Sequence, residues 1–216
     1  MKQWICILAA CGITAGGLAQ TKPRYENDFE KAEVGKVPED LLVLNGAFAV
    51  QQTNGNKFLE MPGAPLDDYS LIFGPTESAG IMVSARIQAT RQGRRFPAFA
   101  IGLNGAGGYE LQVAPARKSL ELLKGEAVLA RVPYPWESDT WTRLKLQVRK
   151  VGDGVWKVEG KAWKHGTSSP SDWTITWTDT ETPKPGRASL WGCPFADTPI
   201  RFDDLSVERT PSPRGP

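Results

Sequence analysis

The sequence predicts an all-β protein built as a two-sheet antiparallel β-sandwich, and two observations predict this class. Short runs in which apolar and polar residues alternate follow one another, with Gly, Pro, Asn and Asp between them. This is the pattern of antiparallel strands joined by turns. In addition, the 22 glycines and 17 prolines among 216 residues interrupt the chain too often for long helices.

About a dozen strands at roughly ten-residue spacing account for the chain. The clearest runs cover 81–90, 99–103, 109–113, 120–124, 128–132, 144–148, 156–162, 173–177 and 200–208. Weaker alternation covers 27–30, 41–52, 57–61 and 70–73. Each run has one apolar and one polar side, which is typical of sheets that pack on one face only.

The N-terminus has the features of a secretory signal peptide over residues 1–19. One lysine precedes a short apolar run, and small residues follow it. The run is shorter than the roughly 20 residues of a bilayer span, so no transmembrane segment is expected. Cleavage after Ala19 would leave a soluble chain from Gln20. Cleavage before Cys11, where Leu-Ala-Ala-Cys matches a bacterial lipobox, would make Cys11 a lipidated first residue. Either way we expect export to the periplasm or beyond, as a membrane-attached lipoprotein in the second case.

The remainder is predicted to be one sandwich domain, residues 20–209, with a disordered Pro/Ser/Gly tail at 210–216. The formal net charge of +2 is too balanced to indicate nucleic-acid binding. Cys193 is the one cysteine outside the signal region, so no disulfide framework is expected. We interpret it as a small core residue.

Three segments resemble a known family. These are Asp28-Phe29-Glu30 with Gly35 and Pro38, the run from Trp141 to Val148, and the run from Ile200 to Val207. Together they resemble exported bacterial domains of the concanavalin A-like lectin/glucanase superfamily. The resemblance implies a jelly-roll sandwich in which the first and last strands pair and a concave face often binds sugars. Because its members include lectins, laminin-G-like modules, carbohydrate-binding modules and glycoside hydrolases, it does not select a function.

Three alternating carboxylates, Glu26, Asp28 and Glu30, are weak catalytic candidates. On a strand they would share one face, and a retaining glycosidase needs two carboxyl groups about 5–5.5 Å apart. Laminarinase-type members of the superfamily carry such a strand, but in mid-chain, with an aliphatic residue where this chain has Asn27. A structural metal or solvated charges at a strand edge are the alternatives.

Asp203 and Asp204 interrupt the apolar alternation of the last strand by one residue, which predicts a β-bulge there. If the first and last strands pair, Asp28 or Glu30 would approach Asp204. Carboxylates are the ligands that Ca²⁺ prefers, so these residues are candidates for a structural Ca²⁺ site, the only cofactor that the sequence suggests. Carboxylates that cap backbone amides are the alternative.

Tryptophans are the candidate ligand-binding residues, because sugars lay apolar faces on aromatic rings. Trp136 in a loop, Trp163 on a polar strand face and Trp191 before a glycine are the candidates for a sugar platform. Trp156, Trp173 and Trp177 lie on apolar strand faces and are expected in the core.

No other motif indicates a reaction. Arg91, Arg94 and Arg95 form a basic turn that either is solvated or engages acidic polysaccharide. His165 is the one histidine, so neither a hydrolytic triad nor a multi-histidine zinc site is predicted.

The favoured hypothesis is therefore a non-catalytic domain that binds a glycan or cell-surface polysaccharide. A glycoside hydrolase-like enzyme and a structural or partner-binding envelope protein are the alternatives.

Overall fold

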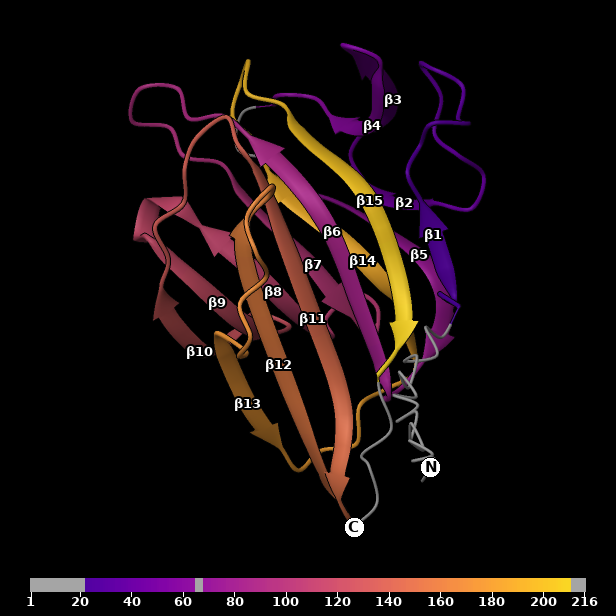
Figure 1. The fold of residues 1–216 in the computed structure, drawn as a ribbon, viewed down its shortest axis with the longest axis vertical. Helices are drawn as coiled ribbons and strands as arrows, with labels where there is room; N and C mark the ends of the chain where they lie inside the picture. Colours follow the sequence, from indigo (N-terminus) through magenta and orange to yellow (C-terminus); the bar gives the residue numbers. More distant parts are fainter. Residues whose placement is uncertain (1–21, 65–67, 211–216) are drawn as a thin grey trace, which may run out of the picture.

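The computed structural model describes residues 22–64 and 68–210, and nearly all of its regular structure is β-strand. Two antiparallel sheets pack face to face (Figure 1). Sheet A has the strand order β13-β12-β11-β6-β15-β4-β3, and β1 also pairs with β15. Sheet B has the order β10-β9-β8-β7-β14-β5-β2. The predicted two-sheet sandwich is confirmed.

The strands of sheet A are β1 (Tyr25–Asn27), β3 (Ala49–Thr53), β4 (Asn56–Met61), β6 (Ile81–Ala89), β11 (Trp141–Gly152), β12 (Val155–Lys164), β13 (Ile175–Asp179) and β15 (Ile200–Arg209). Those of sheet B are β2 (Leu42–Asn45), β5 (Tyr69–Glu77), β7 (Ala98–Leu103), β8 (Tyr109–Ala114), β9 (Ser119–Lys124), β10 (Ala127–Pro133) and β14 (Gly186–Cys193). One 3₁₀ turn, η1 (Pro115–Arg117), connects β8 to β9. Across the described ranges, no helix is long and apolar enough to cross a membrane.

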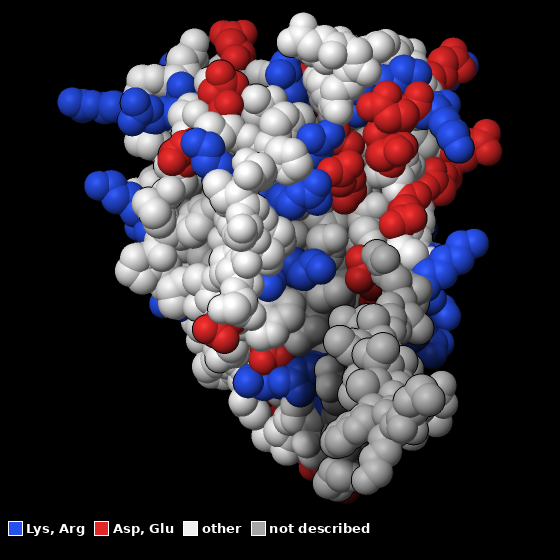
Figure 2. Space-filling model, in the orientation of Figure 1, with Lys and Arg blue, Asp and Glu red and all other residues white. Residues whose placement is uncertain are grey.

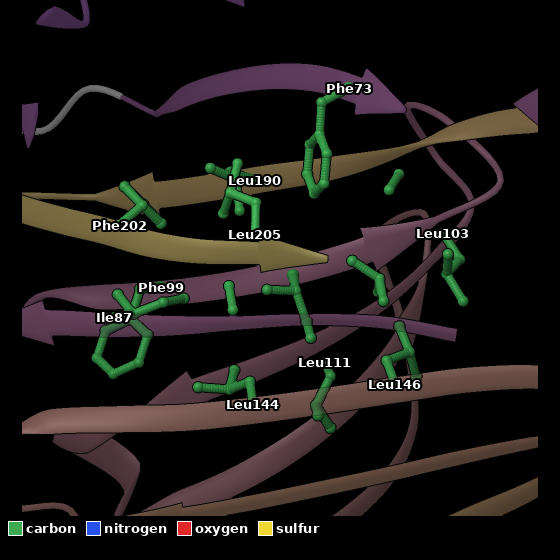
Figure 3. Close-up of a cluster of buried hydrophobic side chains, with 14 of the residues drawn as sticks. Phe73, Ile87, Phe99, Leu103, Leu111, Leu144, Leu146, Leu190, Phe202 and Leu205 are labelled. Carbon is green, nitrogen blue, oxygen red and sulfur yellow. The ribbon is translucent and has the colours of Figure 1, made fainter. Parts of the chain in front are cut away.

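The core fills the space between the two sheets with the inward side chains of both (Figure 3). Phe73, Phe99 and Leu190 point in from sheet B, and Ile87 and Phe202 point in from sheet A. All five are 0% exposed. Full burial of one such side chain contributes about 1.5–3 kcal/mol, so this layer dominates the stability. Because strand residues alternate between faces, each inward residue fixes its neighbours on an outer face.

The first and last strands pair, as the resemblance implies. Glu26 of β1 lies opposite Ser206 of β15, and the Arg24 amide donates to the Val207 carbonyl at 2.8 Å. The register between β15 and β6 shifts between Asp203 and Ser206, and Asp204 adopts a φ of 50°. This irregularity is the β-bulge that the interrupted alternation predicts.

Every one of the clearer predicted runs overlaps a strand, although β13 begins at Ile175 and leaves Trp173 outside it. Three further details differ. Residues 41–52 form two strands, β2 and β3, in different sheets. The predicted strand at 27–30 is wrong: β1 ends at Asn27, and Phe29 then turns with a φ of 59°. Strand β14 was not predicted. The signal peptide, Cys11 and residues 211–216 lie outside the described residues, whereas Thr210 donates its amide to the Gly80 carbonyl at 2.9 Å.

Candidate ligand-binding faces

The outer side of sheet B carries the first candidate site, here called the Trp191 face. Its members form two rows of directly paired residues that run across neighbouring strands. One row is Ser70, Trp191, Ala100, Gln112, Glu121 and Arg131, and the other is Ile72, Ser189, Gly102, Glu110 and Leu123. Because directly paired residues of antiparallel strands point to the same side, these side chains share one surface.

The middle of the Trp191 face, over β7, carries only small groups, and these are covered: Ala100 is 0% exposed and Gly102 is buried. Between Trp191 and Gln112 the first row holds only the methyl group of Ala100, and the second row holds Gly102 at the same strand. A side chain at Gly102 would collide with the Ser189 hydroxyl. Neighbouring strands lie about 4.8 Å apart, so roughly 10 Å separates the strands of Trp191 and Gln112. At one end the surface deepens into a pocket of about 260 Å³ lined by Trp191, Ser189 and Glu110.

A fixed set of polar groups lies farther along the first row of the Trp191 face. The Glu121 carboxylate is 0% exposed and accepts hydrogen bonds from Arg117 Nε at 2.7 Å, Arg131 Nε at 2.8 Å and Ser119 Oγ at 2.6 Å. A second nitrogen of Arg117 donates to the Gln112 side-chain oxygen at 3.2 Å. Burial alone would raise the pKa of Glu121, but the bonds from Arg117 and Ser119 outweigh it and lower the pKa to about 2. The carboxylate is therefore ionised, and it holds both arginines in place.

Glu110 has the opposite electrostatic setting on the same face. Burial raises its pKa to about 7, and the charge of Asp68 adds to this effect. Near neutral pH the carboxyl group is thus partly protonated. It can donate a hydrogen bond as well as accept one.

The outer side of sheet A carries the second candidate site, a groove of about 880 Å³ that we call the Trp163 groove. Figure 2 shows a hollow on this side, with basic side chains in it and carboxylates gathered along the β1 edge. Glu26 and Asp28 line it near β1, and Trp163 and Ser169 line the opposite side. Its floor comes from β6, β11 and β15, including Lys145.

A network of ion pairs and stacked rings lies next to the groove on the outer side of sheet A, and two of its members, Arg143 and Asp204, also line the groove. Arg86 donates to the buried Asp203 carboxylate at 2.5 Å, and Arg143 donates to Asp204 at 2.6 Å. The Arg86 guanidinium also stacks over the Trp141 ring at 4.8 Å. Burial raises the pKa of Asp203, against the opposing effects of Asn56 and Arg86. These ion pairs form a structural layer, in which the buried Arg86 Nε makes no hydrogen bond and lies 3.3 Å from the Asp204 carboxylate.

The structure places the three predicted platform tryptophans in different regions. Trp191 lies on sheet B and Trp163 on sheet A, so they belong to opposite faces. Trp136 packs edge-on against Phe99, at 6.2 Å between ring centres. The three tryptophans therefore do not lie together on one surface.

The remaining tryptophans divide between the core and the surface. Trp156 is buried, as expected. Trp173 is half-buried with the Lys161 ammonium 5.1 Å from its ring centre. Trp177, expected in the core, is 38% exposed because it lies on the edge strand β13.

Glu26, Asp28 and Glu30 do not share a strand face, since β1 ends before Asp28. Glu26 is exposed beside Ser206. The Asp28 carboxylate accepts the Glu30 amide at 3.2 Å, and the Glu30 carboxylate accepts the Lys57 amide at 3.0 Å. Asp28 and Glu30 thus cap backbone groups of the turn and its neighbour, while a catalytic role for the three remains an untested prediction.

The four predicted metal ligands divide in the same way. Asp203 and Asp204 are taken up by Arg86 and Arg143, while Asp28 and Glu30 bond to amides. Within residues 22–64 and 68–210, no group of three or more His, Cys, Asp or Glu side chains is arranged to hold a metal ion. Ca²⁺ binding by these residues is not supported by their geometry.

The basic turn and the histidine have local partners. Gln92 and Arg95 form an isolated bridge, and the Arg91 guanidinium lies 5.6 Å from the Phe96 ring centre. His165 Nδ1 accepts a hydrogen bond from Arg143 Nε at 3.0 Å. Burial and the positive charge of Arg143 lower the pKa of His165.

Sequence reasoning missed the polar residues of both faces. Glu121, Arg117 and Arg131 of the Trp191 face, and Lys145 of the Trp163 groove, were not singled out. A usable signal existed for Glu121, because a lone carboxylate between Leu120 and Leu122 marks the outward side of a buried strand. Nothing comparable marks Lys145, which is one of several lysines on outward strand faces.

Comparisons with known proteins identify the fold. No protein-family model matches the chain, and no curated protein matches it. Among solved structures it is similar to the carbohydrate-binding module CBM66 from Bacillus subtilis, with 18% identity over 78% of this chain and 95% of that one, at a TM-score of 0.54.

Two further structures agree. A Bacillus subtilis protein with a galectin-like fold is 16% identical over 86% and 94% of the two chains, at a TM-score of 0.59. The PL-14 alginate lyase from Aplysia kurodai is 10% identical over 87% and 99%, at a TM-score of 0.57. At this identity the likeness establishes the fold alone. The chain therefore has the concanavalin A-like lectin/glucanase fold that its first, middle and last segments predicted.

Proposed function

We propose that this protein is a carbohydrate-binding domain and that the Trp191 face is its binding surface. The observation that carries the proposal is the pocket of about 260 Å³ at one end of this face, which Trp191, Ser189 and Glu110 line. Its fold, shared with a carbohydrate-binding module and a galectin-like protein, supports the same function.

Trp191 is the ring best placed to stack against a sugar. It is half-buried, and within the described part of the chain no other ring or cation packs on it. By contrast, the Trp136 ring packs against Phe99, and Trp163 has the Lys161 ammonium 5.8 Å from its ring centre. A pyranose ring in the pocket would lay its C–H face on Trp191.

The polar groups of the Trp191 face can hydrogen-bond to the hydroxyl groups of a sugar. Arg117 and Arg131 have side chains that are each 52% exposed, and Glu121 fixes their position. Their remaining N–H groups can donate to sugar oxygens, while Glu110 and Ser189, which line the pocket, can both donate and accept. Because Glu121 orients the arginines before any ligand arrives, less conformational entropy is lost on binding.

A glycan array tests the proposal, with the mature protein from Gln20 onward and its Trp191→Ala variant, with Ca²⁺ and with a chelator. We expect selective binding that Trp191→Ala weakens at least tenfold, which corresponds to about 1.4 kcal/mol. Trp177→Ala is the matched control, because Trp177 is an exposed tryptophan on the other sheet. No binding in either buffer, or equal binding by both variants, would overturn the proposal.

The enzyme alternative is checked with the same samples. The bound glycan is incubated with protein and the products are analysed by mass spectrometry. Turnover that Glu26→Gln abolishes would establish the hydrolase alternative in place of simple binding. We also propose export of the chain, which rests on residues 1–19 and is tested by fractionating cells that express it, with Cys11→Ser to detect lipidation.

A further inference from the structure

A row of paired residues crosses the floor of the Trp163 groove, and its end member Lys161 lies next to the groove, beside the ring of Trp163. It runs through Lys161 of β12, Lys145 of β11, Ser84 of β6, Ser206 of β15 and Glu26 of β1. Each is the direct partner of the next, so all five side chains point to the outer side of sheet A. The row changes from two cations through two hydroxyls to a carboxylate. With strands about 4.8 Å apart, roughly 14 Å separates the strand of Lys145 from that of Glu26.

Most charged side chains in the two neighbouring rows form ion pairs. On one side, Arg143 pairs with Asp204 and Arg86 pairs with Asp203. On the other side, Glu159 is held by Arg149 at 2.7 Å and by Lys157 at 3.1 Å. These charges of the neighbouring rows are therefore engaged in pairs that build the sheet, whereas Glu208, in the second of these rows, accepts a hydrogen bond from the Ser206 hydroxyl at 3.2 Å.

The two lysines of the middle row have no such partner. Within the residues that the structure describes, no carboxylate lies within ion-pair distance of Lys145 or Lys161. Lys161 donates to the Pro170 carbonyl at 2.6 Å and lies beside the rings of Trp163 and Trp173. Burial and the neighbouring charge of Lys145 lower the pKa of Lys161, against the opposing charge of Asp172. Like charges directly opposite each other destabilise a sheet, so this pair is an unfavourable arrangement that an anion would relieve.

We propose that the Trp163 groove is a second ligand site, for a saccharide that carries a single acidic group, and that Lys145 with Lys161 binds that group. The proposal concerns the opposite face from Trp191 and does not depend on it. Trp163 would contact the sugar ring next to the acidic group, and Ser84 and Ser206 would meet hydroxyls along the row. Glu26, Asp28 and Glu208 line the far side together with Lys31, and the three carboxylates can accept hydrogen bonds from further hydroxyls.

The acidic side of the groove limits the number of charges on the ligand. An anion at every sugar unit would bring a carboxylate or sulfate close to Glu26 and Glu208, and like charges repel there. One acidic group at the end of an otherwise neutral saccharide avoids this repulsion. A zwitterionic peptide would also match the two charged ends, but it would leave the two serines and the face of Trp163 without a polyol to bind.

Isothermal titration of the mature protein separates these ligands. The first probe is a trisaccharide of two glucose units and one terminal glucuronic acid, and its control is the same trisaccharide with the carboxylate reduced to the alcohol. A maltotriose that carries one terminal sulfate ester distinguishes a sulfate from a carboxylate. Each is measured with wild type, Lys145→Met, Lys161→Met and Trp163→Ala. Lys184→Met serves as a control on an exposed lysine outside the groove.

We expect wild type to bind at least one acidic trisaccharide about tenfold more tightly than the neutral control. Lys145→Met should remove that difference, Trp163→Ala should weaken every trisaccharide, and Lys184→Met and Trp191→Ala should change nothing. Lys145→Met should also fold normally, since it relieves the repulsion with Lys161. If Lys145→Met and Lys161→Met both still bind the acidic trisaccharides as tightly as wild type, the proposal is overturned. Triglycine is the zwitterionic peptide probe, and tighter binding of triglycine than of any trisaccharide would overturn it as well. Acidic binding that disappears with Trp191→Ala would overturn it too, but would support the Trp191 face.

Discussion

Each outer face of this sandwich contains a buried carboxylate paired with arginine, but the two faces differ in how exposed the arginine is. On sheet B, Glu121 lies at the edge of the face, under two arginines whose side chains are 52% exposed. On sheet A, Asp203 lies in the β-bulge, under Arg86, whose side chain is 16% exposed. The first arrangement leaves charged donors at the surface, where a ligand can reach them. In the second arrangement, the arginine is mostly buried and its hydrogen bonds are made within the protein.

The difference shows that the same kind of pair can have a binding or a structural role, depending on how much of the cation remains accessible. Around Asp203, Asn56 and Trp141 also enclose Arg86. Around Glu121 no ring covers the arginines within the described chain. Three measurements on stability test this contrast, from the largest expected effect to the smallest.

Replacing Asp203 with Ala should have the largest effect. It removes a buried carboxylate and leaves Arg86 nearly buried without its closest partner, which costs about 3–5 kcal/mol of unfolding free energy. Asp204→Ala is the control: its side chain is 32% exposed, so we expect a loss of at most about 1 kcal/mol. Urea denaturation measures both, and equal losses would contradict the structural role assigned to Asp203.

Glu110 should make stability depend on pH. Its pKa is raised to about 7 in the folded state, so the folded protein binds more protons than the unfolded chain between pH 4.5 and 7. Stability is therefore greatest below pH 4.5 as far as this group is concerned, and it is lost as the pH rises toward 7, by up to about 3 kcal/mol. Urea denaturation at pH 5 and pH 8 measures the loss. Glu110→Gln should abolish this part of the dependence, and an unchanged difference would exclude Glu110 as its source.

Glu121→Ala should cost less than Asp203→Ala although both carboxylates are buried. Arg117 and Arg131 can turn into water when Glu121 is removed, so we expect a loss of about 1–2 kcal/mol. The same variant should weaken glycan binding, because the arginines lose their fixed position. A stability loss as large as that of Asp203→Ala would show that the Trp191 face is built as rigidly as sheet A, which removes the contrast.

Much of the fold could be predicted from the sequence because it depends on local alternation. Runs such as 81–90 and 144–148 carry strict period-two patterns, and the interrupted pattern at Asp203 correctly predicted the bulge. Strand β14 was missed because its inward residues include the small Ala188 and Gly192, while its largest side chain, Trp191, points outward. Its period-two signal is therefore weak.

The candidate sites were less predictable, because they depend on register. Whether Lys145 lies opposite Lys161 or one residue away decides whether two cations meet, and pairing between strands is a tertiary property. Glu26, Asp28 and Glu30 show the converse. Their spacing fits a strand, but a left-handed residue at Phe29 ends the strand between them.

The pairing of the first and last strands has a practical consequence for experiments on immobilised protein. Arg24 and Thr210 both lie within a few residues of Glu26 and Glu208, which line the Trp163 groove. A surface linker, tag or fusion partner joined at either end of the described chain would crowd that groove and leave the Trp191 face open. A sensor tethered in this way would under-report acidic saccharides relative to ligands of the other face, whereas attachment through an exposed lysine of a loop such as Lys184 would not share that bias.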